Sequence, residues 1–274
     1  LIADVQGHDK IQVHLNTELS AVDGFVGSFK STLSNNGSQQ ELVHGVAVIA
    51  TGGAPLRTEE YSYGKDPRIM TSLELDKCVG SREPQRPYCS RVCCTHSIDN
   101  ALELKKRNPA MNVFVLYRDV RTYGEREYIY KEAREKGVIF IRYDLEKKPQ
   151  VTFNGGRLEV TVTDHVLGQP VLIEADLLTL ATAVVPNRDD ALAQFFKVPL
   201  NDDGFFVEKH AKLGPSEFAT DGVFLCGLAH YPKPIDEAIV HGRAAFSRAV
   251  TLLAREKIRT SGQVAAVDPL VCSS

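Results

Sequence analysis

The sequence lacks the marks of several protein classes. Its 274 residues carry a formal net charge of −3 without a basic block, which argues against a nucleic-acid partner. The longest apolar runs, such as Gly45–Thr51, have the length of a strand and are too short to span a bilayer. A secretory signal pattern is absent as well. We therefore expect a cytoplasmic protein without a membrane span.

The glycine-rich turn of dinucleotide-binding domains is also missing. No G-x-G-x-x-G motif, which opens a Rossmann unit and holds a pyrophosphate, occurs anywhere in the sequence. The hydrophobic fraction of 43% is enough for a sizeable core in one or two domains. The fold must therefore be inferred from the order of the predicted elements.

A duplicated pattern of strands is present instead. A strand, a small meander and a buried strand occur twice, about 130 residues apart. The first copy covers the segments 11–15, 18–33 and 45–55, and the second covers 138–142, 151–166 and 176–186. Both buried strands end in Ala-Thr, with a proline four residues later, at Pro55 and Pro186. This layout predicts an α/β fold of two interleaved Rossmann-like domains, each with a β-meander.

Helical patterns lie where such a layout requires them. The segment Thr95–Arg107 has apolar residues at helical spacing, and the predicted strand NVFVLY follows it. Glu125–Lys136 is a charged amphipathic helix that Gly137 closes. A long helix is predicted over Ile235–Lys257.

Four of the six cysteines lie in one short segment. Their spacing is C-x10-C-x3-C-C, at Cys78, Cys89, Cys93 and Cys94. In a chain without secretory features, such a group indicates a metal or redox site rather than a disulfide framework. Four thiolates are the usual ligand set of an iron–sulfur cluster, and a helix start beside Cys94 favours thiolates through its N–H groups. Arg82 and Arg91 add positive charge nearby.

Three other interpretations stay open on the spacing alone. A structural zinc site is the first, although such sites prefer cysteine pairs separated by about two to four residues. A redox-active dithiol at Cys93-Cys94 is the second, although a disulfide between neighbours closes a strained ring. The third is that the cysteines are small buried hydrophobic residues.

Several long motifs resemble the A subunits of heterodisulfide reductases and their bacterial relatives. The resemblance is carried by the cysteine segment, by the strand and helix that follow it, and by segments near both ends. It covers essentially the whole chain, in the motifs PYCSRVCCTHSIDNAL, YRDVRTYGEREYIYKEAREKGVIFIRY, GFVGSFK, VAVIATGG, GFFVEKHAKLGPSEFATDGVFLCGLAHYPKPIDEAI and VAAVDPLVC.

The resemblance implies a flavoprotein with a thioredoxin-reductase-like core of the FAD/NAD(P)-binding type. It implies FAD and [4Fe–4S] clusters as cofactors, and one cluster held together by Cys78, Cys89, Cys93 and Cys94. The implied partners are other heterodisulfide-reductase-type subunits and a ferredoxin, hydrogenase or flavin oxidoreductase. On this basis we predict an FAD domain in 1–77 and 176–260, a degenerate NAD(P)-like domain with the cysteines in 78–175, and a linker to a ferredoxin domain in 261–274.

The predicted FAD-binding residues follow from two motifs of this resemblance. VIATGG resembles the strand and turn that pack against FAD, and its residues are Ala50, Thr51 and Gly52. GVFLCGLAHYPKPIDEA resembles the final FAD motif, in which a strand leads into a helix whose N–H groups point at the flavin. The residues assigned to this motif are Gly227, Leu228, Ile235, Asp236 and Ala238.

Some features depart from the family pattern. Leu228 stands where thioredoxin reductases have an aspartate that binds the ribityl chain. A glycine-rich Rossmann unit is expected upstream of Leu1, a strand is missing before Cys78, and Cys272 resembles the first ligand of a ferredoxin domain. We therefore expect the isolated chain to be inactive and to bind no FAD by itself.

Two sets of polar residues allow more than one interpretation. Arg118 and Arg121 lie where a 2′-phosphate could be paired, but solvated loop residues are the favoured interpretation. His230, His241 and Asp236 could shuttle protons, but polar residues at a helix start are more often caps.

The combined prediction is an electron-transfer oxidoreductase. In it, FAD exchanges electron pairs and the cluster passes single electrons toward partner subunits. The alternatives are an NAD(P)H-dependent disulfide reductase that uses Cys93-Cys94 and a zinc-stabilised docking scaffold.

Overall fold

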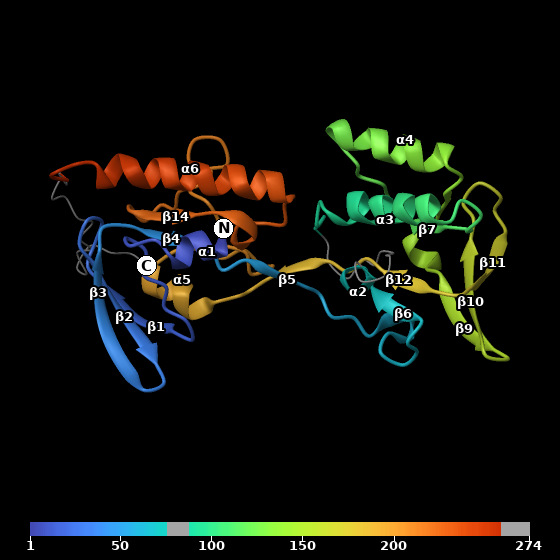
Figure 1. The fold of residues 1–274 in the computed structure, drawn as a ribbon, viewed down its shortest axis with the longest axis horizontal. Helices are drawn as coiled ribbons and strands as arrows, with labels where there is room; N and C mark the ends of the chain where they lie inside the picture. The colour runs from blue at the N-terminus through green and yellow to red at the C-terminus, as the bar shows by residue number, and fades with distance from the viewer. Residues whose placement is uncertain (76–87, 259–274) are drawn as a thin grey trace, which may run out of the picture. The chain divides into compact units, whose positions relative to one another are not determined.

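The computed structural model describes residues 1–75 and 88–258, and these divide into two compact units. Unit 1 consists of 1–50, 188–226 and the residues from 239 onward, whereas unit 2 consists of 51–187 and 227–238. Each unit therefore combines distant parts of the sequence, and Figure 1 labels their elements. In the described part of the chain, no helix is long and apolar enough to cross a bilayer.

The edges of the units differ from the predicted domain boundaries. Strands β5 (Gly53–Pro55) and β13 (Val184–Pro186) pair antiparallel with each other, and both belong to unit 2. These strands contain the two prolines that end the duplicated pattern, so the two copies meet through their ends. The assignment of one domain to FAD and of the other to a cluster stays a prediction.

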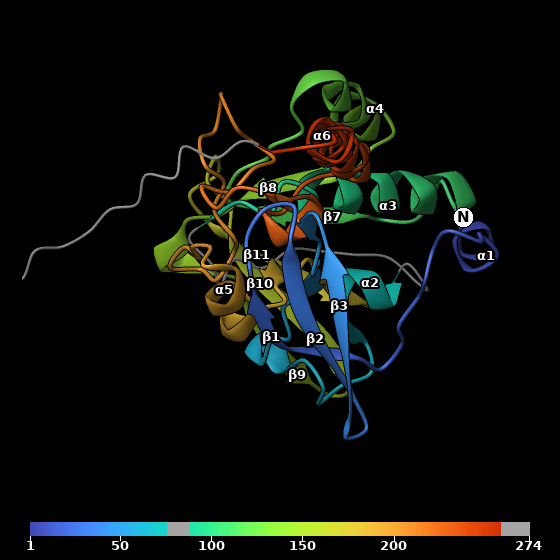
Figure 2. The same cartoon turned by 90° about the vertical axis from the view of Figure 1, so that its left-hand side faces the viewer.

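A three-stranded meander is the largest sheet of unit 1. Its strands β1 (Glu18–Asp23), β2 (Phe29–Asn35) and β3 (Ser38–His44) follow one another antiparallel, as the bluest arrows of Figure 2 show. Asn36 and Gly37 both have positive φ, 46° and 86°, which is the conformation of a two-residue hairpin turn. The hairpin predicted within 18–33, around Asp23-Gly24, is confirmed by the antiparallel pairing of β1 with β2, and Gly24 in its loop has a φ of +89°.

Unit 1 also contains a short parallel pair. Strand β4 (Ala47–Ile49) pairs with β14 (Val223–Leu225), which follows it in sequence only after more than half of the chain. Helix α6 (Ile235–Leu253) covers this pair, because Phe224 packs against Ala245 of the helix. Buried strands and an amphipathic helix form a Rossmann-like layer in this way.

Unit 2 repeats the plan of unit 1. Its meander consists of β9 (Gln150–Asn154), β10 (Arg157–Thr163) and β11 (Pro170–Ala175), with β10 in the middle. Gly155 and Gly156 have positive φ in the turn between the first two strands, as the sequence predicts.

Two parallel strand pairs accompany this second meander. Strand β6 (Ile69–Thr71) pairs with β12 (Leu178–Leu180), and β7 (Phe114–Tyr117) pairs with β8 (Ile139–Arg142). Helices α3 (Cys93–Arg107) and α4 (Glu127–Glu135) pack on a shared apolar core. The remaining short elements are α1 (Ile2–Gln6), α2 (Ser72–Leu75), α5 (Asp190–Phe196), η1 (Glu60–Ser62), η2 (Gly124–Arg126), η3 (Leu145–Lys147) and η4 (Gly227–Ala229).

Two local predictions are wrong. The segment 11–15 forms no strand, and its apolar side chains Ile11, Val13 and Leu15 are 43%, 47% and 65% exposed. An isolated strand is unstable without a neighbour, and no described strand pairs with this segment. Helix α6 ends at Leu253 rather than Lys257, because the charged residues 255–257 interrupt its apolar spacing.

Candidate functional site

The described cysteines of the cluster motif lie at the start of α3 in unit 2. Cys93 and Cys94 form the first turn of the helix, and Cys89 precedes it. Cys94 is buried with 7% exposure, whereas Cys89 and Cys93 are half-buried, and none of the three forms a disulfide. Cys78 and Cys272 lie outside the described residues.

Residues beside Cys89 dock this segment on strand β13. The Tyr88 hydroxyl donates a hydrogen bond to the Val184 carbonyl over 2.8 Å, and the Val184 N–H donates to the Ser90 hydroxyl over 3.0 Å. The ring of Tyr88 also meets the ring of Tyr231 edge-on, with 5.6 Å between the centroids. The backbone on both sides of Cys89 is therefore fixed by unit 2 itself.

Two cysteine sulfurs accept hydrogen bonds from backbone N–H groups. The Arg91 N–H lies 3.3 Å from Cys89 Sγ, and the Arg121 N–H lies 3.2 Å from Cys94 Sγ. The pKa of the Arg121 guanidinium is raised, first by its hydrogen bond to Asp119 and further by the Cys89 sulfur beside it. Backbone N–H groups donate in the same way to metal-bound sulfur, so these contacts of Cys89 and Cys94 are compatible with a soft metal.

The described thiols do not form a complete metal site. Within residues 1–75 and 88–258, no three His, Cys, Asp or Glu side chains gather closely enough to hold one ion. The donor chemistry thus fits a cluster, whereas the three predicted ligands that the structure describes, Cys89, Cys93 and Cys94, are not brought together. Their joint ligation stays a prediction.

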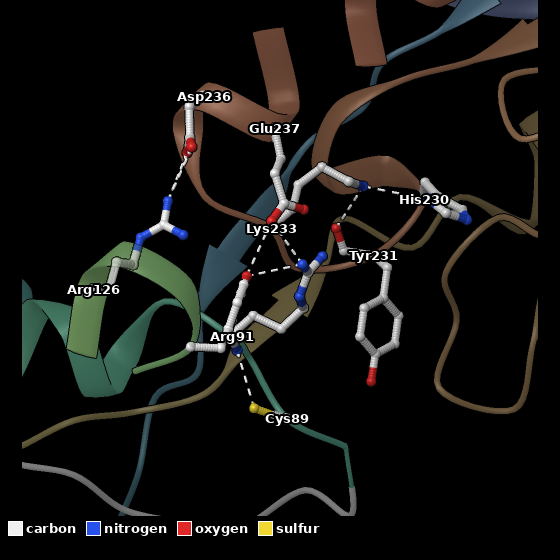
Figure 3. Close-up of polar contacts among 9 residues, drawn as sticks. Cys89, Arg91, Arg126, His230, Tyr231, Lys233, Asp236 and Glu237 are labelled. Carbon is white, nitrogen blue, oxygen red and sulfur yellow. Dashed lines mark hydrogen bonds and ion pairs between the residues drawn. The ribbon is translucent and has the colours of Figure 1, made fainter. Parts of the chain in front are cut away.

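An arginine next to the cysteines contacts the beginning of α6. The Arg91 guanidinium donates to Glu237 Oε1 over 2.7 Å (Figure 3). It also donates to the Tyr123 hydroxyl over 2.9 Å. A second pair joins the same turn of the helix, because Arg126 donates to both carboxylate oxygens of Asp236 over 3.0 Å. All of these residues belong to unit 2.

The loop arginines considered for a 2′-phosphate have other contacts. The Arg121 guanidinium forms an ion pair with Asp119 over 2.7 Å and is 57% exposed. The Arg118 carbonyl accepts a hydrogen bond from Arg142. A role for either arginine in nucleotide binding stays untested by this geometry.

The first predicted FAD segment lies between β4 and β5. Thr51 is half-buried, yet its Oγ1 atom is buried and has no hydrogen-bond partner among the described residues. The Thr51 carbonyl accepts from the Asn187 side chain over 2.8 Å, and Gly52 has a φ of +77° that favours glycine. A buried hydroxyl without a partner fits a site whose ligand would supply one. Ala50, the third predicted residue of this segment, directly follows strand β4.

The second predicted FAD segment comes close to the first within unit 2. A Cβ atom placed on Gly53 would lie 3.5 Å from Leu228 Cβ and 2.9 Å from the Val185 carbonyl oxygen. Gly227 begins η4 with a φ of +67°. The structure therefore places Gly53, the residue after Gly52, next to Leu228.

A buried lysine holds the turn between η4 and α6. Lys233 is 8% exposed, and its Nζ donates to the carbonyls of Gly227 and Tyr231 over 2.6 and 2.9 Å. The same nitrogen lies 3.3 Å from His230 Nδ1 (Figure 3). The ammonium thus fixes the backbone that leads from the predicted flavin strand to the helix.

The predicted residues at the start of α6 have different surroundings. Ile235 is 80% exposed, whereas the Asp236 carboxylate is held by Arg126. The Ala238 N–H is bonded to the Pro234 carbonyl over 2.9 Å, so it is part of the helix ladder. The N–H groups of the residues before Ala238 in the first turn have no acceptor within the helix, so they are the ones that could donate to a ligand. His241 belongs to unit 1, where its Nε2 lies 3.0 Å from the Pro215 carbonyl.

Sequence reasoning missed four residues of this region, namely Tyr123, Asn187, Lys233 and Glu237. Glu237 is the second acid after a Pro-Ile start, and Lys233 lies between two prolines. Such positions indicate a helix start and a turn, but they do not indicate which distant residue is contacted.

Comparison with known proteins identifies the relatives of this chain. No family model matches it. It is 32% identical over 254 residues to an iron–sulfur A subunit of the CoB–CoM heterodisulfide reductase of Methanopyrus kandleri. The match covers 80% of this chain and 38% of that relative. The chain is similar to the A subunits of heterodisulfide reductases.

A second relative supports the similarity to these heterodisulfide reductase A subunits. A protein of Archaeoglobus profundus that is named for its likeness to the same A subunits is 36% identical over 203 residues, covering 72% of this chain and 28% of that relative. The predicted resemblance is confirmed. The chain spans less than half the length of the curated relatives it matches.

Solved structures show the fold of the chain. Thioredoxin reductase of T. acidophilum superposes with a TM-score of 0.54 at 14% identity, covering 87% of this chain and 74% of that one. The flavoprotein disulfide reductase RclA of Escherichia coli gives 0.55 at 13% identity, covering 95% and 55%. The predicted thioredoxin-reductase-type α/β fold is confirmed.

Proposed function

We propose that the chain is part of an electron-transfer subunit of the heterodisulfide reductase type, and that it is an oxidoreductase in that setting. The observation that carries the proposal is the similarity to a heterodisulfide reductase A subunit over 80% of the chain. When bound, FAD supplies two-electron chemistry and an iron–sulfur cluster supplies one-electron chemistry.

The residues of the turn regions would position the flavin. Thr51 offers a buried hydroxyl, and Gly52 and Gly227 allow a close backbone approach through their positive φ. The N-terminal N–H groups of α6, at Ile235 and Asp236, favour negative charge on a ligand. Leu228 in place of an aspartate leaves one polar contact to be supplied by another group.

The cysteine segment would hold the cluster. Cys89 and Cys94 already accept N–H hydrogen bonds, and Cys93 shares the first turn of α3, whose dipole favours thiolates. Cys78 is the proposed fourth ligand. Because the described thiols are not gathered, binding requires a local rearrangement around the helix start.

The proposed partners are proteins of the same kind of complex. One curated relative is the A subunit of a heterodisulfide,ferredoxin reductase of Methanothermobacter thermautotrophicus. Other heterodisulfide-reductase-type subunits and a ferredoxin, hydrogenase or flavin oxidoreductase are therefore proposed to exchange electrons with this chain, in the cytoplasm.

Electron paramagnetic resonance tests this function. The chain is reconstituted with iron and sulfide without oxygen and is then reduced with dithionite. We expect a signal from a reduced cluster in the native chain and in Cys226→Ala, whose cysteine lies in unit 1. The signal should be lost in Cys94→Ala, with folding checked by circular dichroism.

Two outcomes would contradict the proposal. One is the absence of a cluster signal in the native chain. The other is a signal of equal size in the Cys94→Ala variant. Stoichiometric NADPH binding by the native chain would instead support the disulfide reductase alternative.

A further inference from the structure

A single carboxylate oxygen on α6 accepts hydrogen bonds from two different loops. Glu237 Oε1 lies 2.7 Å from an Arg91 guanidinium nitrogen and 3.0 Å from the Tyr123 hydroxyl. The two donors also contact each other over 2.9 Å. Hydrogen bonds to a charged acceptor are the strong ones, and this oxygen makes two of them.

The first of these loops carries Cys89. Arg91 has a φ of +61°, in the left-handed region that residues with a Cβ atom rarely adopt. In this conformation the Arg91 N–H points at Cys89 Sγ. The side chain of Arg91 is fixed by Glu237 and by the Tyr123 ring, whose centroid lies 5.5 Å from its guanidinium carbon. The contacts with α6 thus hold the unfavourable backbone that contacts the Cys89 sulfur.

The second loop contacts Cys94. Tyr123 follows two residues after Arg121, whose N–H donates to Cys94 Sγ over 3.2 Å. The Cys94 thiol in turn lies 3.9 Å from the Asp119 carbonyl. The loop 119–123 therefore borders the Cys94 sulfur at one end and reaches Glu237 at the other.

We infer that Glu237 is a positioning residue that holds Cys89 and Cys94 in place through Arg91 and Tyr123. The inference deepens the proposed function, because it concerns two of the proposed cluster ligands. It also means that the first turn of α6, which carries the proposed flavin-binding residues Ile235 and Asp236, is connected to the cysteine segment through hydrogen bonds. Both proposed cofactor sites would then share one anchoring side chain.

A simpler role for Glu237 makes a different prediction. Acidic residues in the first turn of a helix are stabilised by the helix dipole, and Asp236 occupies the same turn. If Glu237 only stabilised the helix, removing its partner Arg91 and removing Arg126, the partner of Asp236, would have the same effect on the cysteines. Arg126, which pairs with Asp236 and also lies over the Tyr123 ring at 5.6 Å, provides the matched control.

Thiol alkylation of the metal-free chain tests the inference. Iodoacetamide is added to the reduced chain under native conditions, and the rate at each cysteine is followed by peptide mass spectrometry. Loss of a charged hydrogen bond that keeps a segment closed should accelerate its labelling about tenfold. Cys226 in unit 1 is the internal reference.

The variants have distinct expected patterns. Glu237→Met should accelerate Cys89 and Cys94 together, and Glu237→Gln should restore part of the protection because its amide oxygen still accepts hydrogen bonds. Arg91→Met should act mainly on Cys89, and Tyr123→Phe, which keeps the ring, should act mainly on Cys94. Arg126→Met should change neither rate.

Other patterns would overturn the inference. Unchanged rates in Glu237→Met, equal effects of Arg126→Met, or an equal acceleration of Cys226 would each do so, the last because it reports global unfolding. The assay contains no iron or flavin, so it is independent of the cluster signal described above. If Glu237 protects the two cysteines but no cluster signal is found, only the proposed function is refuted. If a cluster signal is found but Glu237→Met leaves the labelling rates unchanged, only this inference is refuted.

Discussion

The two units share a plan but differ in how a meander is tied to the neighbouring parallel strand. In unit 1 the tie is His44, whose Nε2 lies 2.7 Å from the Ser31 hydroxyl and whose Nδ1 lies 2.9 Å from the Val46 carbonyl. The His44 ring also stacks on Phe29, with 5.4 Å between centroids. An imidazole ring with an aromatic neighbour thus joins β3 to β4.

In unit 2 the corresponding tie is a hydrogen bond from an arginine side chain, which an ion pair holds in place. Arg68 precedes β6 and donates to the Gly156 carbonyl in the meander turn over 2.9 Å. Its guanidinium is held by Asp66 over 2.8 Å. The comparison shows that one arrangement of strands can be fixed by different chemistry, so the repeat is visible in the strand pattern and not in the side chains.

The cores of the two units differ as well. In unit 2 the middle strand of the meander buries alternate residues, Leu158, Val160 and Val162. In unit 1 the first strand of the meander is mostly exposed, and the largest fully buried side chains include Phe205, which lies outside the meander. The segment 188–226 therefore supplies much of the hydrophobic core of unit 1, whereas the meander supplies much of the core of unit 2.

The largest expected effect comes from truncating these cores. Phe205→Ala should lower the free energy of unfolding by about 3–5 kcal/mol, and Leu158→Ala by about 2–5 kcal/mol, because each leaves a cavity. Urea denaturation measures the loss, and hydrogen exchange shows where it occurs. Protection should fall in 188–226 for the first variant and in the strands β9–β11 for the second. A uniform loss of protection in both variants would show that the units do not have separate cores.

A smaller effect of opposite sign is expected at the end of the first repeat. Thr51→Val replaces a buried hydroxyl that has no partner among the described residues, so the free energy of unfolding of the ligand-free chain should rise by about 1 kcal/mol. Thr182→Val, at the equivalent position of the second repeat, is the matched control and should not stabilise the chain. Thermal and urea unfolding compare the two. Destabilisation by Thr51→Val would mean that the hydroxyl is already satisfied.

The smallest effect concerns the ion pair of unit 2. The pKa of Asp66 is lowered from 3.8 to about 2, first by the side-chain hydrogen bond from Arg68 and then by the Arg68 N–H. A carboxyl whose pKa is lower in the folded state adds stability above the unfolded value and loses it as the pH falls through the folded value. The native chain should therefore lose more stability than Asp66→Asn between about pH 4 and pH 2, as urea titrations at both pH values can show. Equal losses would contradict the assigned shift.

Local patterns in the sequence predict much of this fold. Asn36-Gly37 and Gly155-Gly156 place the meander turns correctly, because the positive φ that these turns need is easy for glycine. The apolar spacing after Thr95 places α3, although the helix begins two residues earlier, at Cys93. The segment 11–15 shows the limit, since alternation without a pairing neighbour does not make a strand.

The candidate site is less predictable, because its contacts join distant residues. Arg91 and Glu237 are 146 positions apart, and no local pattern indicates that they pair. The resemblance to a family locates the cysteines and the glycine turns, since these are motifs. It does not locate Asn187 or Lys233, whose roles depend on backbone carbonyls that any sequence could supply.

Metal analysis tests the central claim most directly, namely that the cysteines of unit 2 hold an iron–sulfur cluster. The chain purified without oxygen should contain about four iron and about four acid-labile sulfide atoms. Cys226→Ala should keep this content, and Cys94→Ala should lose most of it. One zinc atom per chain without sulfide, or an iron content that Cys94→Ala leaves unchanged, would contradict the claim.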